Sequence, residues 1–174
     1  DMEKITTEKA MLKPRFGHGG FGIKIYDKNK VILKEKFSTD YILQELLDTT
    51  GGVPELGIKG VHDIRSVIIN GVIAYAYVRV PKTGLLANLH QGGKAINVTA
   101  PNKVVKIIKK IDKYMKVFGD RVYSADFFFS NGEYHLVELN SKPGFDACGK
   151  YGFAEEENKF FELFFKKILL KKMG

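Results

Sequence analysis

Two carboxylates and one side-chain amide lie close together in the sequence, on either side of a short polar stretch. Asp126 precedes Ser130-Asn131-Gly132, and Glu138 and Asn140 follow it. Oxygen donors of this kind suit a hard cation such as Mg²⁺, which keeps some water ligands and takes others from bound phosphates. The competing interpretation is a pair of solvated carboxylates on strands, with no metal. Spacing alone leaves both interpretations open.

Two strands and a turn must position these donors. Three phenylalanines before the polar stretch and the bulky residues 134–139 after it favour a β-hairpin. With a two-residue Asn131-Gly132 turn, Asp126 pairs with Val137 and lies on the opposite face from the other two donors, because side chains alternate along a strand. With a three-residue turn, Asp126 pairs with Leu136 and all three donors share a face. A metal site therefore predicts the three-residue turn.

A second candidate site is the glycine-rich segment 15–22, which reads RFGHGGFG. The backbone N–H groups of such a loop can surround an anion, since glycine tolerates the positive φ that this requires. The segment lacks the Gly-Lys-Ser/Thr of a Walker A motif, and the alternating residues 23–26 after it favour a strand rather than a helix. It predicts a strand–loop–strand flap over phosphate, against the alternative of a plain flexible turn.

The rest of the chain reads as strands and loops followed by two helices. Strands are expected at residues 10–14, 23–26, 31–34 and 63–80, the last being a hairpin around Asn70-Gly71, and residues 41–47 form a mostly apolar run with one Gln-Glu pair. A helix is expected from Thr99 to Phe118, with Gly119 after it and an apolar stripe of Val104, Ile108, Ile111, Met115 and Phe118. Residues 155–172 predict a second helix, for which a core position is favoured over a membrane surface.

Length and composition indicate one globular domain or a large piece of one. The 174 residues are 44% hydrophobic, and no apolar run approaches the roughly 18 residues that span a membrane. Cys148 is the only cysteine, so no intrachain disulfide can form and a reducing, cytoplasmic compartment is expected. The net charge of +8 attracts anions. The lysines of the first helix lack interleaved arginines or aromatics, which favours a solvated face over nucleic-acid binding.

Taken in order, these motifs resemble the ATP-grasp superfamily, and within it the branch of glutathione synthetase and the glutamate ligases that modify ribosomal protein. The resemblance runs from about Leu12 to Phe145. It rests on Lys13-Pro14 with the glycine loop, Gln44-Glu45, Asp63-Ile64-Arg65, Arg79, Asn88-Leu89-His90-Gln91-Gly92-Gly93, and Asp126 followed by Glu138-Leu139-Asn140-Ser141-Lys142-Pro143-Gly144.

The resemblance implies an α+β fold with antiparallel sheets, a glycine-rich flap and packed helices, in which two subdomains clamp ATP. Residues 1–47 would form part of the nucleotide-binding subdomain, and residues 48–174 the carboxy-terminal subdomain with the metal site. Such enzymes use ATP and Mg²⁺, with Mn²⁺ as an alternative, to join a carboxylate to an amine or similar nucleophile through an acylphosphate. Small-molecule or peptide substrates are expected, and a homo-oligomer is allowed.

The resemblance also assigns roles by position. Nucleotide contacts fall on Lys13, Gly17, His18, Gly19, Gly20, Gln44, Glu45, Leu46 and Asp63. Among these, Lys13 resembles the phosphate contact, Gln44 to Leu46 the strand that reads adenine, and Asp63 the acidic residue near the ribose. Asp126, Glu138 and Asn140 match the magnesium ligands. Arg79 and Asn88 resemble catalytic groups near the transferred phosphate and the acylphosphate.

Family members carry a preceding domain that helps to hold substrate, so a fragment of a longer enzyme is expected here. Leu86 stands where some members have an arginine for acidic substrates. The expected function is an ATP- and Mg²⁺-dependent ligase. A non-catalytic nucleotide-binding remnant with the same fold and, less favoured, a basic nucleic-acid-binding module are the alternatives. The ligase requires Asp126, Glu138 and Asn140 to converge and the segment 17–20 to face them.

Overall fold

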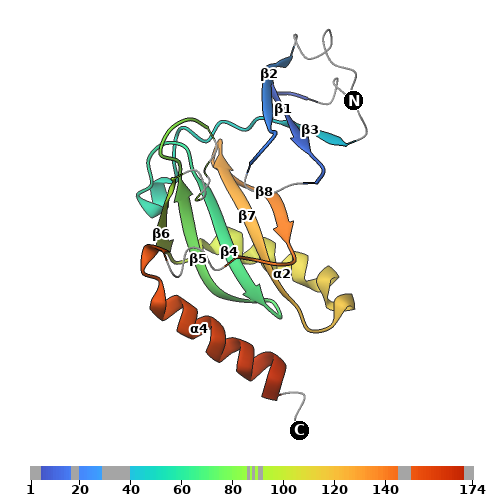
Figure 1. Ribbon diagram of the computed structural model, residues 1–174, viewed down its shortest axis with the longest axis vertical. Coiled ribbons are helices and arrows are strands. Elements are labelled where there is room, and N and C mark those ends of the chain that lie inside the picture. Colours follow the sequence, from blue (N-terminus) through green and yellow to red (C-terminus); the bar gives the residue numbers. More distant parts are fainter. Residues whose placement is uncertain are drawn as a thin grey trace. The chain divides into compact units, whose positions relative to one another are not determined.

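The structure is a computed structural model, and it describes residues 5–16, 20–28, 40–85, 87, 89, 92–144 and 150–170. The chain forms two compact units, Asp1–Asp48 and Thr49–Gly174, and each has its own antiparallel sheet (Figure 1). The division lies one residue beyond the boundary that the sequence suggests between residues 47 and 48.

The first unit is a three-stranded sheet in the order β2-β1-β3. Its strands are β1 (Lys9–Pro14), β2 (Lys24–Asp27) and β3 (Tyr41–Glu45). Ile5 and Ala10 are buried, and Tyr26 and Leu43 pack against them on one face of the sheet. Strand β3 holds Gln44 and Glu45 but ends before Leu46, the third residue of the strand expected to read adenine, and the strand expected at 31–34 lies outside the described residues.

The second unit is a five-stranded sheet in the order β6-β5-β4-β7-β8, with β4 at its centre. The strands are β4 (Asp63–Ile69), β5 (Val72–Val80), β6 (Lys94–Val98), β7 (Val122–Ser130) and β8 (Glu133–Asn140). The β4–β5 hairpin turns at Asn70 and Gly71, which both have positive φ, as their sequence predicts. Strand β6 is missing from the sequence prediction, which ends a loop at Lys94.

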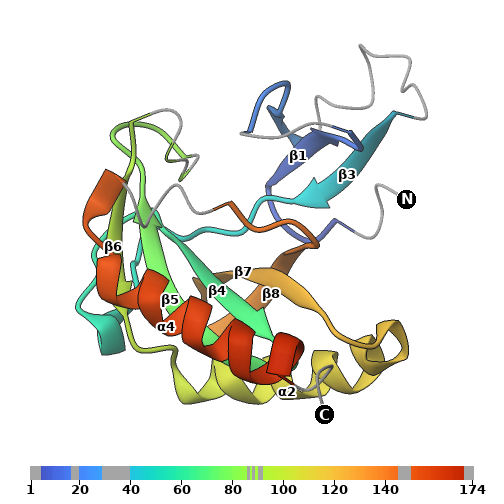
Figure 2. The ribbon, with the colours of Figure 1, turned by 60° about the horizontal axis from the view of Figure 1, so that its bottom comes forward.

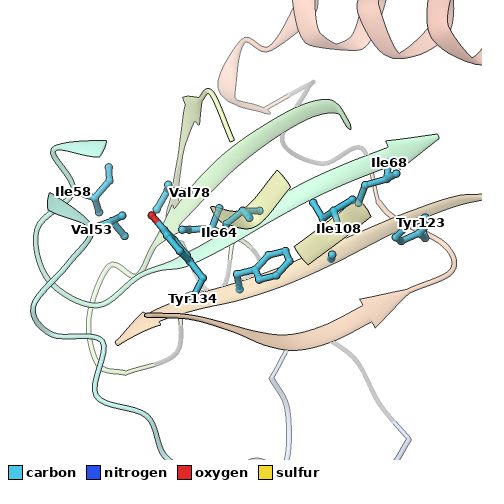
Figure 3. Packing of buried hydrophobic residues seen from close by; sticks show 11 residues of the cluster. Val53, Ile58, Ile64, Ile68, Val78, Ile108, Tyr123 and Tyr134 are labelled. Carbon is cyan, nitrogen blue, oxygen red and sulfur yellow. The ribbon is translucent and has the colours of Figure 1, made fainter. Parts of the chain in front are cut away.

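Helices cover both faces of this sheet (Figure 2). Helix α2 (Asn102–Met115) is followed by a 3₁₀ turn (Lys116–Phe118), and helix α4 (Ala154–Phe164) continues as a π-helical turn (Phe165–Leu169). A further 3₁₀ turn spans Pro54–Leu56. The α2 side holds the core shown in Figure 3, in which Ile108 packs with Ile64, Ile68 and Phe127. The α4 side holds a second core built on aromatic rings, with Phe160 against Tyr75 and Phe153 against Tyr77.

Both expected helices are present, but the apolar stripe of α2 differs from the prediction at its end. Phe118 is 71% exposed rather than buried. Asp112 instead occupies a buried position, and its carboxylate accepts two hydrogen bonds from Arg121, at 2.8 Å from Nε and 2.5 Å from Nη2. Within the described residues, no helix is long and apolar enough to cross a membrane.

Candidate functional site

The β7–β8 hairpin brings Asp126 and Glu138 face to face, although its turn contradicts the sequence prediction. Asn131 and Gly132 both have positive φ, and Ser130 pairs with Glu133, so the turn has two residues rather than three. Further along the strands the register shifts, from Phe127 opposite Leu136 to Asp126 opposite Glu138. Val137 is the extra residue of a β-bulge, and the bulge restores the alignment that the short turn alone would lose.

Asn140 completes the group of oxygen donors. It pairs with Ser124, two residues before Asp126 on β7, so its side chain lies on the same face as the two carboxylates. Its Nδ2 donates a 2.8 Å hydrogen bond to Oε1 of Glu138. The three predicted magnesium ligands therefore come together on one face of the sheet. This hydrogen bond fixes the orientation of the Asn140 side chain, so its Oδ1 is directed away from Glu138 Oε1.

Asp126 belongs to a buried network of four charged residues from three adjacent strands. Arg65 on β4 lies opposite it, with Nε 2.7 Å from Oδ1 and Nη2 2.6 Å from Oδ2. Arg79 on β5 lies opposite Asp63 on β4, with Nε 3.1 Å from Oδ1 and Nη2 2.5 Å from Oδ2. A bond of 2.7 Å from Arg79 Nη2 to Asp126 Oδ2 joins the two pairs.

Burial and pairing act in opposite directions on these groups. Burial raises the pKa of Asp63 to about 6; Arg79 opposes this rise and the charge of Asp126 adds to it. Burial would also raise the pKa of Asp126, but the hydrogen bonds and charges of Arg65 and Arg79 outweigh it and hold that pKa below its ordinary value. Asp126 is therefore ionised at neutral pH.

The donor set fits Mg²⁺ held jointly by the protein and a ligand. Two carboxylates and an amide supply hard oxygen atoms, and Oδ1 of Asp126 takes only one of the three arginine hydrogen bonds, which leaves it a lone pair. Within the described residues, no group of three or more His, Cys, Asp or Glu side chains could hold a metal by itself. A magnesium ion here would need phosphate oxygens and water as further ligands.

In the first unit, strand register separates the predicted nucleotide contacts. Gln44 pairs with Met11, and Lys13 lies two residues along the same strand, so Lys13 and Gln44 share one face of the sheet. Glu45 lies on the other face, where its Oε1 accepts hydrogen bonds from the backbone N–H and the hydroxyl of Thr6. Among the described residues, Oε1 of Gln44 is buried with no hydrogen-bond partner, a position that suits a ligand able to donate to it.

The other predicted residues divide between loops and the undescribed part of the chain. Leu46 lies just beyond β3, and its N–H donates to Lys9 O at 3.2 Å. Gly20 has a φ of 72°, a conformation that glycine adopts readily. Four residues lie outside the described part of the chain: Gly17, His18, Gly19 and Asn88. The expectation that the segment 17–20 faces the metal ligands falls on the same part.

Two residues at the site have no role in the sequence prediction. Arg65 is part of the Asp63-Ile64-Arg65 motif, yet only the register between β4 and β7 reveals that it faces Asp126. His62 is fully buried, and its Nε2 accepts a hydrogen bond from Phe129 N–H at 3.1 Å while Nδ1 lies 3.1 Å from Gly60 O. Burial lowers the pKa of His62, so the ring is neutral and ties the start of β4 to β7.

Two curated proteins that are similar to this chain are both named as α-L-glutamate ligases. Tetrahydromethanopterin:α-L-glutamate ligase of Methanocaldococcus jannaschii is 27% identical over 165 residues, which cover 89% of this chain and 53% of that protein. A probable α-L-glutamate ligase of Halorhodospira halophila is 24% identical over 154 residues, covering 84% of this chain and 46% of that protein. The chain thus spans about half the length of the curated relatives it matches.

Solved structures share the fold at low sequence identity. D-alanine–D-alanine ligase from Bacillus anthracis in complex with ATP has a TM-score of 0.61 and 16% identity, covering 100% of this chain and 57% of that chain. The ATP-grasp ligase PsnB with a minimal precursor, Mg and ADP has a TM-score of 0.54 and 18% identity, covering 85% and 41%. The family model described as a RimK-like ATP-grasp domain matches residues 5–162. The chain belongs to the RimK-like ATP-grasp family.

Proposed function

We propose that this chain carries the nucleotide and metal site of an ATP- and Mg²⁺-dependent ligase that joins a carboxylate to an amine. The observation that carries the proposal is the direct opposition of Asp126 and Glu138, with Asn140 bonded to Glu138 and Arg79 bonded to Asp126. Family membership supports the same reaction class, because the relatives are ligases by name.

The reaction has two steps that conserve atoms and charge. An oxygen of the substrate carboxylate attacks the γ-phosphorus of ATP, and the bond between that phosphorus and the oxygen bridging to the β-phosphate breaks. The products of this step are ADP and an acylphosphate. The amine nitrogen then attacks the acyl carbon, phosphate departs, and the nitrogen loses a proton to give the amide. Bound Mg²⁺ supplies charge neutralisation at the phosphates. Neither step needs a covalent intermediate with the protein.

The side chains divide the work by their chemistry. Asp126, Glu138 and Asn140 would hold Mg²⁺ through their oxygen atoms. Arg79 would neutralise charge on the transferred phosphate and on the oxyanion that forms when the amine attacks. In the first unit, Lys13 and Gln44 would contact the nucleotide from the face that they share. We assign Asn88 and the segment 17–20 to the acylphosphate and the nucleotide phosphates by position in the family alone.

The substrate class can be narrowed to testable candidates. The relatives named above are α-L-glutamate ligases, which makes L-glutamate the first amine to test. Leu86 stands where some family members carry an arginine for acidic substrates, so neutral amino acids belong in the same panel. Use of ATP fits a cytoplasmic location.

ADP release tests the proposal. The chain, and the longer protein if it extends beyond these residues, is incubated with ATP, Mg²⁺ and a panel of carboxylates and amino acids. We expect release that depends on both substrates, with the new amide detected by mass spectrometry. Asp126→Ala/Glu138→Ala should abolish release, whereas Glu133→Ala, exposed at the start of β8, should not. ATP binding without turnover would indicate a non-catalytic remnant. Salt-sensitive binding to nucleic acid that survives the double substitution would support the basic module.

A further inference from the structure

We propose that Asp63 and Arg65, on the central strand β4, are positioning residues that hold Arg79 of β5 and Asp126 of β7 for the reaction. This inference rests on the proposed function, because it concerns the same site. It gives Asp63 a different task from contact with the ribose, which its position in the family suggests.

Strand register makes the arrangement possible. Asp63 and Arg65 are two residues apart, so both side chains lie on one face of β4. Asp63 pairs directly with Arg79 on one neighbouring strand, and Arg65 pairs directly with Asp126 on the other. Asp63 and Arg65 therefore each contact one site residue on the adjacent strand. One hydrogen bond, from Arg79 to Asp126, links the two pairs.

The Asp63–Arg79 and Arg65–Asp126 pairs are both bidentate, a geometry that fixes the guanidinium and the carboxylate in one plane. Arg79 binds Asp63 through Nε and Nη2, and Arg65 binds Asp126 through the same two nitrogens. Such pairs fix orientation as well as distance, which a single ammonium cannot do. In Arg79 the nitrogen Nη1 takes no part in these bonds, so we assign its N–H groups to the transferred phosphate.

The oxygens of Asp63 decide between its two roles. Both accept from Arg79, so a ribose hydroxyl could reach only their second lone pairs, and the bidentate pairing gives the orientation of Arg79 as the main task of this side chain. Two carboxylates and two guanidiniums make the network neutral, and loss of one member would leave an unpaired buried charge. The geometry thus favours Asp63 as the holder of Arg79.

Ribose-modified nucleotides separate these roles in Asp63→Asn, because binding can be measured without turnover. If Asp63 positions Arg79, the variant should keep the wild-type ratio of affinities for ADP and its 2′,3′-dideoxy analogue. Its kcat should fall by about 100-fold, as expected for a misplaced catalytic group. If Asp63 contacts the ribose, the affinity ratio should instead fall toward one and kcat at saturating ATP should stay at the wild-type value. That result would overturn the assignment.

Asp112→Asn is the matched control for a general loss of stability. Asp112 and Arg121 form another bidentate pair, with side chains 9% and 11% exposed, close to the values for Asp63 and Arg79. Both variants should unfold at lower denaturant concentration, but only Asp63→Asn should lower kcat per folded molecule. An equal fall in kcat in the two variants would reduce the role of Asp63 to fold stability and overturn the proposal.

Arg65→Lys tests the second pair, with a readout that does not need turnover. Lysine keeps the charge but cannot fix both oxygens of Asp126, so the Mg²⁺ concentration for half-maximal binding of a non-hydrolysable ATP analogue should rise about tenfold or more. Unchanged Mg²⁺ dependence would contradict the positioning role of Arg65. If wild-type protein binds nucleotide but forms no amide, the proposed ligase function fails while both binding tests still decide this inference.

Discussion

Asp126 lies directly opposite Glu138, although the two-residue turn between their strands should place Val137 there. The bulge at Val137 resolves the conflict, because it inserts one residue between the turn and the metal ligands. The hairpin thus combines a tight, stable turn with a register that the turn alone does not allow.

Deletions within β8 should show that this bulge acts only by setting the register that places Asp126 opposite Glu138. Deleting Val137 removes the extra residue and leaves Asp126 opposite Glu138, so Mg²⁺-dependent nucleotide binding should persist. Deleting Leu139 moves Asn140 to the opposite face, so the same binding should weaken by at least about tenfold. Calorimetric titration with a non-hydrolysable ATP analogue measures both. Equal loss in the two deletions would mean that the bulge itself shapes the site.

The two glycines of the hairpin turns should differ in their tolerance of alanine. Gly71 and Gly132 both have a φ of 80°, where a Cβ costs about 1–2 kcal/mol. A Cβ at Gly71 would also lie 2.4 Å from Oδ2 of Asp112, whereas one at Gly132 meets nothing within 4 Å. Gly71→Ala should therefore lower the free energy of unfolding by about 1–3 kcal/mol more than Gly132→Ala. Urea unfolding of both variants checks this, and equal losses would refute the clash.

His62 should make the fold sensitive to acid. Burial lowers its pKa in the folded chain, so the unfolded chain binds the proton more tightly. Its contribution to stability is complete above the unfolded pKa of about 6.5 and is lost as the pH falls below that value. Urea unfolding between pH 7 and 5 should show falling stability in the wild type and a flatter profile in His62→Gln.

Asp63 contributes with the opposite sign in part of that range. Its pKa rises to about 6 in the folded chain, so the folded state binds this proton more tightly and gains stability as the pH falls from about 6 towards 4. Asp63→Asn should therefore make the acid-induced loss steeper than in the wild type. A flatter profile in Asp63→Asn would contradict the sign of this shift.

Local sequence patterns predicted those elements that local physics determines. Asn70-Gly71 gave a correct hairpin turn because positive φ at both positions is a property of those residues. Helix α2 followed from its apolar period, although Asp112 occupies a place in the buried stripe that the period assigns to apolar residues. The order of motifs identified the family, which the comparison with family models confirms.

The contacts between site residues could not be predicted from the sequence, because they depend on pairing between strands that are distant along the chain. Arg65 faces Asp126 only because β4 lies between β5 and β7, and no local pattern encodes that order. Strand β6 escaped prediction because it is a half-exposed edge strand with little apolar alternation. The bulge at Val137 escaped because the turn and the strand specify different registers, and tertiary packing decides between them.

Binding of Mg²⁺ with a nucleotide to Glu138→Gln tests the central claim most directly. The substitution keeps the shape of the side chain and removes one of the two facing carboxylates, while Glu133→Gln at the start of the same strand is the control. Calorimetric titration with a non-hydrolysable ATP analogue is carried out with Mg²⁺ and with EDTA. We predict that Glu138→Gln loses the Mg²⁺-dependent part of the affinity and keeps the metal-independent part, as Glu133→Gln retains both. An undiminished response to Mg²⁺ in Glu138→Gln would contradict the assignment of this hairpin as the metal site.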